Sequence, residues 1–108
     1  MDAEVIFLDT SVLIDYFRKT KKENSFLYKL SPVSTRFAVS IITKFEILIG
    51  SNENQQVFWD EFFERVEIVD YDDLSNQKAI EIHKELKVKN QLIGFADLMI
   101  GATALVEM

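Results

Sequence analysis

Three short runs of β-forming apolar residues, each followed by a segment with helical character, constrain the fold of this chain more than any other feature. The runs span residues 4–8, 37–40 and 66–69. The first, Glu4-Val-Ile-Phe-Leu8, predicts a strand that is buried on both faces. Strands that alternate with helices predict a mostly parallel sheet covered on both sides. We therefore expect an α/β fold with three layers, α/β/α, in one domain over residues 1–108.

The segments between the strands carry the signals of helix starts and stops. Helices are expected over residues 12–18, 22–30, 43–50 and 52–64, from Asp72 or Asp73 to Asn90, and from about Ala96 onward. Asp9-Thr-Ser11 supplies the N-cap of the first, and Gly50 is a typical stop for the third. Because Met108 lies inside an apolar helix with no strand after it, we expect the chain to be truncated at its C-terminus.

Composition narrows the classes of protein to consider. The chain has no cysteine, which excludes disulfides and thiolate metal sites and is typical of a reducing cytoplasm. No run is long enough to span a membrane, and the N-terminus lacks the basic start of a signal peptide. A cytoplasmic protein is therefore expected.

Charge is unevenly distributed. The net charge is −6, but residues 45–73 alone hold nine acidic side chains and one basic one. A basic cluster comprises Arg18, Lys19, Lys21 and Lys22. Such a cluster is usually a solvated surface, although it could contact phosphates. The acidic balance predicts weak non-specific binding to nucleic acid and does not exclude an RNA substrate.

Three carboxylates are expected at one edge of the sheet. Asp9 directly follows the first strand, Glu46 is expected in the first turn of the helix after the second strand, and Asp97 in the first turn of the last helix. Ligands of open parallel sheets bind beyond the carboxyl ends of the strands. Hard cations such as Mg²⁺ prefer oxygen ligands of this kind. The three acids are therefore candidate ligands of one divalent ion.

Each acid also has a purely structural explanation. Asp9 could simply cap the first helix. Thr43-Lys-Phe-Glu46 matches a capping box, in which Glu46 bonds back to the backbone of Thr43. Asp97 would be a favourable charge near the positive end of a helix dipole. On spacing alone the structural explanation is favoured for Glu46 and Asp97, and both explanations stay open for Asp9.

Three stretches of the sequence together resemble the motifs of the PIN-domain family, in particular the VapC toxins of bacterial VapBC toxin–antitoxin pairs. The stretch from Ile6 to Phe17, IFLDTSVLIDYF, resembles the first motif. VSIITKFEILIG, from Val39 to Gly50, resembles the second, and LIGFADLMIGATAL, from Leu92 to Leu105, resembles the third. The resemblance covers almost the whole chain.

The resemblance implies a metal-dependent endoribonuclease with a cluster of acidic residues. Asp9 and Asp97 would be direct ligands of Mg²⁺ or Mn²⁺, and Glu46 a ligand or a residue acting through bound water. The hydroxyl of Thr10 or Ser11 could orient a water or a phosphate, although capping is favoured for both. The resemblance also implies a cognate antitoxin, which lays an amphipathic segment into a groove between helices, and homodimers.

Other side chains are assigned less direct roles. His83, the only histidine, is expected to be packed or partly exposed rather than catalytic, which leaves a metal-activated water as the nucleophile. Asp15 is expected to pair with a local basic group such as Arg18 rather than to bind metal. An aromatic stripe is expected to be at least half core, the remainder forming an exposed interface: Phe58, Trp59, Phe62 and Phe63.

Two rival interpretations remain. A haloacid-dehalogenase-type phosphatase also begins with an apolar strand that ends in Asp, but it needs a second Asp where Ser11 stands. The alternative is a catalytically impaired PIN-like module that only binds an antitoxin or RNA. The family's fourth acidic position lies beyond Asp97, after the next strand, and the sequence ends before it.

Overall fold

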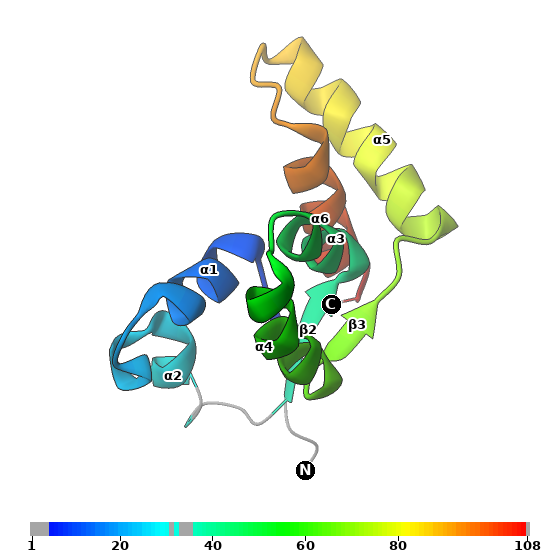
Figure 1. Ribbon diagram of the computed structural model, residues 1–108. Helices are drawn as coiled ribbons and strands as arrows, with labels where there is room; N and C mark the ends of the chain where they lie inside the picture. Colours follow the sequence, from blue (N-terminus) through cyan, green and yellow to red (C-terminus); the bar gives the residue numbers. More distant parts are fainter. Residues whose placement is uncertain (1–4, 31, 33–35, 108) are drawn as a thin grey trace.

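The computed structural model describes residues 5–30, 32 and 36–107 (Figure 1). Its strands are β1 (Val5–Leu8), β2 (Arg36–Ser40) and β3 (Glu67–Val69). Its helical elements are α1 (Thr10–Arg18), the 3-10 turn η1 (Lys22–Asn24), α2 (Phe26–Leu30), α3 (Ile41–Ile49), α4 (Glu53–Glu64), α5 (Asp73–Val88) and α6 (Phe95–Glu107). Expectations that fall on Glu4, Ser31 and Met108 lie outside the described residues. Among the helices that are described, none is long and apolar enough to cross a membrane.

The three strands form a parallel sheet in the order β1-β2-β3. Leu8 lies opposite Val39, and Ser40 lies opposite Val69, so the carboxyl ends of all three strands meet at one edge. Because Asp9 follows Leu8 directly, its backbone lies at this edge. The expected parallel α/β architecture, with helices flanking the sheet, is confirmed.

β1 is less buried than its composition predicts. Leu8 is 2% exposed, but Val5 is 42% exposed, and the two residues between them are partly exposed. In the part of the chain that the structure describes, β1 pairs with β2 only and is therefore an end strand. The expectation of burial on both faces thus holds at the carboxyl end of β1 and is wrong at its start.

The main core lies between the sheet and the helices from α1 to α4. Its buried members are Leu8, Leu13, Leu27, Val39, Ile47, Trp59 and Phe63. A second, smaller cluster joins α5 to α6 through Ala79, Leu98 and Ala102. These two helices run in opposite directions as a hairpin that projects from the sheet, and α6 also packs against α3 and β2 (Figure 1).

Side-chain caps decide where the helices begin. The expected helix over residues 22–30 is divided at Ser25, whose backbone is extended. The Ser25 hydroxyl donates to the Lys22 carbonyl (2.6 Å) and accepts from the Tyr28 amide (3.2 Å), so it ends η1 and starts α2. Asp72 caps α5 by accepting from the Ser75 amide at 2.9 Å. Asn90, at φ 56°, ends that helix as expected.

Candidate metal centre

Asp9 joins β1 to α1 and is the N-cap of that helix. Its Oδ1 accepts from the Val12 amide at 3.0 Å and from the Ser11 hydroxyl at 2.8 Å. The capping role that the sequence left open is therefore confirmed. Both of these bonds use the same carboxylate oxygen, and the side chain is exposed. The cap thus holds Asp9 in one orientation at the edge of the sheet without excluding a role as a ligand.

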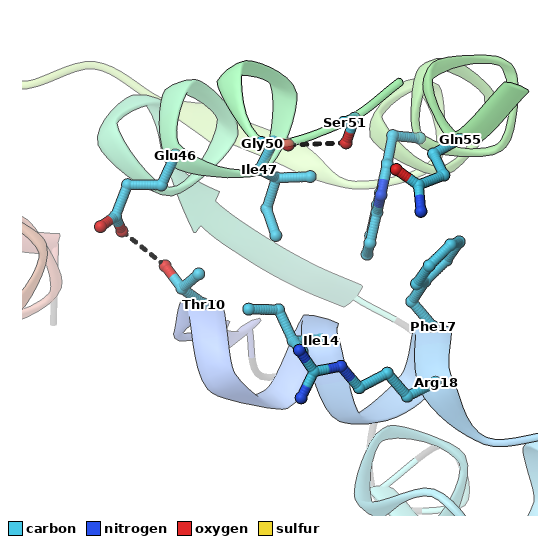
Figure 2. Close-up of a pocket in the computed structure, with 10 residues that line it drawn as sticks. Thr10, Ile14, Phe17, Arg18, Glu46, Ile47, Gly50, Ser51 and Gln55 are labelled. Carbon is cyan, nitrogen blue, oxygen red and sulfur yellow. Dashed lines mark hydrogen bonds between the residues drawn. The ribbon is translucent and has the colours of Figure 1, made fainter. Parts of the chain in front are cut away.

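Glu46 lies in the second turn of α3, not in the first. The helix begins earlier than expected because the Ser40 hydroxyl caps it, accepting from the Ile42 amide at 3.0 Å. The capping box of Thr43 and Glu46 is therefore wrong. The Glu46 Oε1 instead accepts from the Thr10 hydroxyl at 2.9 Å, a contact between two helices (Figure 2). This bond connects the second sequence motif to the residue that follows Asp9.

Asp97 lies in the first turn of α6, where the sequence places it, and is exposed. No described residue donates a hydrogen bond or forms an ion pair to its carboxylate. The position is favourable for a negative charge because the N-terminus of a helix carries partial positive charge. α6 packs against β2 and against α3, the helix that carries Glu46.

The structure brings the three acids together only in part. It links Glu46 to the Asp9–Thr10 turn, and it leaves Asp97 without a direct contact to either. Within residues 5–30, 32 and 36–107, there is no group of three or more His, Cys, Asp or Glu side chains that could hold a metal ion. The chemistry of the donors nevertheless fits an oxygen-preferring divalent cation, since carboxylates and hydroxyls supply every candidate ligand.

A cavity of about 370 Å³ lies beside Glu46, between α1, α3 and α4 (Figure 2). Thr10 and Glu46 lie at one end, and Phe17, Arg18 and Gln55 lie toward the other. Arg18 lines the cavity although the sequence placed it in a basic surface cluster. The one signal in the sequence is that Arg18 follows Thr10 by two helical turns, which indicates that both side chains lie on the same face of α1.

Lys19, another member of the basic cluster, has a structural partner. Lys19 forms an ion pair with Asp15 at 3.5 Å, so Asp15 does pair with a local basic group, and that group is Lys19 in place of Arg18. Asp15 also accepts from the Phe26 amide at 3.0 Å. The pKa of Asp15 is lowered from its ordinary value of 3.8, mainly by this hydrogen bond and to a smaller extent by the charge of Lys19.

The aromatic stripe on α4 is core. Trp59 and Phe63 are 3% and 5% exposed. Phe58 and Phe62 are partly buried, and their rings pack on Tyr16 of α1 at centroid distances of 6.2 and 6.1 Å. The expectation that part of the stripe forms an exposed interface is therefore wrong. The expectation fails because an aromatic side chain of α1 packs on these two rings. The helical period of α4 alone does not reveal this contact.

His83 is partly buried on α5, and its ring lies 5.9 Å from that of Phe95. Its neighbours there are residues of α5 and α6 that line a separate cavity. A packed histidine at this position agrees with the sequence analysis.

The chain is similar in sequence to a known protein family and to one of its characterised relatives. The model of the PIN domain family matches residues 6–107. A relative, Ribonuclease VapC1 of Methanocaldococcus jannaschii, is 37% identical over 103 residues, which cover 94% of this chain and 69% of the relative.

Two solved structures illustrate the similarity of fold. One is VapBC2 from Rickettsia felis bound to a DNA fragment from their promoter, at 26% identity and a TM-score of 0.81, covering 96% of this chain and 82% of that one. The other is VapBC-1 from nontypeable Haemophilus influenzae, at 25% identity and a TM-score of 0.77, covering 94% and 80%.

Proposed function

The chain belongs to the PIN-domain family, and on this premise we propose that it is a metal-dependent endoribonuclease, the toxin of a type II toxin–antitoxin pair. A relative of the chain is named as a ribonuclease. The two solved structures described above are named as VapBC proteins. Both names agree with the activity and the biological role that the sequence motifs imply.

The observation that best supports a catalytic site is the hydrogen bond from Thr10 to Glu46. It holds the acidic side chain of the second motif against the turn that carries Asp9, at the carboxyl edge of the sheet. A glutamate with a solvent-facing structural role would not need a partner on another helix. The contact therefore favours a shared site over three independent caps.

We assign Mg²⁺ or Mn²⁺ as the cofactor, with Asp9 and Asp97 as ligands and Glu46 as a third ligand or the holder of a bound water. When bound, such an ion lowers the pKa of a coordinated water and neutralises charge on phosphate oxygens. The protein contributes the orientation of the carboxylates, through the cap at Asp9 and the Thr10 hydroxyl at Glu46. No cysteine exists to act as a nucleophile, and His83 packs against Phe95 on another part of the fold.

The proposed partners are RNA as the substrate, a cognate antitoxin and a second copy of the chain, all in the cytoplasm. The cavity between α1, α3 and α4 adjoins Glu46 and is a groove that an amphipathic antitoxin segment could fill. Two large apolar side chains of α3, Phe45 and Ile49, are 60% and 68% exposed, which favours an interface on this helix.

Cleavage of a labelled structured RNA, with and without Mg²⁺ or Mn²⁺, tests the proposal. We expect metal-dependent cutting that falls by at least about 100-fold in Asp97→Asn, since loss of a ligand costs more than loss of an outer partner. The matched control is Asp60→Asn, which changes an exposed acid on α4. Unchanged cutting by folded Asp97→Asn would refute the ligand assignment. No cutting by folded wild-type protein would favour the binding-only alternative.

A further inference from the structure

Thr43 is a buried polar residue that the proposed function does not yet use. It is 0% exposed, and its Oγ1 lies 3.2 Å from the Oγ1 of Thr10. Burying a hydroxyl costs free energy unless it is hydrogen-bonded, whereas valine has nearly the same shape and no such cost. Thr43 precedes Glu46 by three residues, so the two side chains lie on the same face of α3.

The direction of the hydrogen bonds follows from counting protons. Thr10 Oγ1 contacts both Thr43 Oγ1 and Glu46 Oε1, at 3.2 and 2.9 Å. An ionised carboxylate can only accept, and a hydroxyl has one proton to donate. Thr10 must therefore donate to Glu46, and Thr43 must donate to Thr10. The three groups form a chain that begins at a buried residue and ends at a carboxylate.

We infer that Thr43 is a positioning residue for Glu46, acting through Thr10. This role rests on the proposed function, because it serves the proposed metal site. By occupying a lone pair of Thr10, Thr43 directs the single Thr10 proton toward Glu46. Thr10 also starts α1 directly after Asp9, so the chain couples the carboxylate of α3 to the turn that holds the first carboxylate.

A positioning role and a packing role require different properties of the side chain at position 43. Packing needs the shape of the side chain, which Thr43→Val preserves. Positioning needs the hydroxyl, which Thr43→Ser preserves. Thr103 supplies the matched control, because it is also 0% exposed and its hydroxyl donates to the Met99 carbonyl within its own helix, at 2.7 Å.

The test measures two quantities in wild-type protein, Thr43→Val, Thr43→Ser and Thr103→Val. The first is the ¹³C resonance of the Glu46 carboxyl group in metal-free, glutamate-labelled protein, assigned by its absence from Glu46→Gln. The second is the Mn²⁺ concentration that gives half-maximal RNA cleavage. We expect Thr43→Val to move the resonance and to raise this concentration by about 10-fold, the usual effect of losing an outer partner of a metal ligand. Thr43→Ser and Thr103→Val should stay close to wild type.

The outcomes separate this inference from the function on which it rests. A Glu46 resonance that does not move in Thr43→Val would overturn the positioning role, whether or not the protein cuts RNA. A moved resonance with an unchanged Mn²⁺ requirement in an active enzyme would overturn it as well. A moved resonance in a wild-type protein that cuts no RNA would support the positioning of Glu46 and reject the nuclease. If Thr43→Val does not fold, Thr43→Cys carries the same test, because a thiol is a weak donor.

Discussion

The carboxylate of Asp9 caps α1 and is also a proposed metal ligand. Its Oδ1 accepts both capping hydrogen bonds, from Val12 and Ser11, and no described residue donates a hydrogen bond to its second oxygen. A loss of activity after substitution of Asp9 would therefore mix two effects, the release of the first turn of α1 and the removal of a ligand. Asparagine separates them, because it caps a helix as well as aspartate does but carries no charge.

We predict that Asp9→Ala destabilises the protein by about 1 kcal/mol, whereas Asp9→Asn stays within about 0.5 kcal/mol of wild type. Both should abolish metal-dependent cleavage. Urea unfolding and the RNA assay measure the two quantities on the same preparations. Equal losses of stability in the two variants would show that the cap contributes nothing, and an active Asp9→Asn would show that Asp9 is no ligand.

The sequence could predict the position of each acid along the chain but not its partner. Asp9 and Asp97 lie in the turns where strand and helix signals place them. Glu46 was misplaced by one helical turn because Ser40, a strand residue by composition, caps α3. The contact of Thr10 with Glu46 joins residues 36 apart in the chain, and no local pattern encodes such a pairing.

The C-terminal end of α1 is held by a lysine from the following turn. The Lys22 ammonium donates to the carbonyls of Tyr16 and Phe17, at 2.7 and 2.9 Å. It also lies 5.0 Å from the centre of the Tyr16 ring and 5.6 Å from that of Phe58. Lys22 thus ties η1, α1 and α4 together. The sequence analysis placed Lys22 among the surface charges. Composition does not predict that the chain turns back after Arg18 and brings Lys22 to the end of α1.

We predict that Lys22→Met destabilises the protein by about 1–2 kcal/mol, through the loss of charged hydrogen bonds and of cation–π contacts. Methionine keeps the length and the apolar stem of the side chain. Lys21→Met is the matched control, because Lys21 is exposed, and should change the unfolding free energy by less than about 0.5 kcal/mol. The same loss in both variants in urea unfolding would mean that net charge, not the Lys22 contacts, is responsible.

The two apolar clusters of the molecule are unequal in size. The cluster under the sheet has buried members from four helices and two strands, whereas the buried members of the α5–α6 cluster are two alanines and a leucine. Less apolar area is buried in the second cluster, and local stability follows the buried area. The alternation of strands and helices predicted the layers correctly, but not this imbalance, which depends on how the last two helices pack.

We predict that the amides of α5 and α6 exchange with deuterium faster than those of β2 and α4. Hydrogen exchange followed by mass spectrometry compares the corresponding peptides in one experiment. A dilution series shows whether a second copy of the chain protects α5 and α6. Equal protection of all these elements at the lowest concentration would contradict the prediction and indicate a single cooperative unit.

The buried indole of Trp59 has a practical consequence. It is the only tryptophan of the chain, it stacks on Phe63, and it lines the same cavity as Thr10 and Glu46. The tryptophan fluorescence of the protein therefore comes from one site that touches both the main core and the groove beside Glu46. Its emission will report on whatever enters that groove, in an unlabelled protein and without any need for turnover.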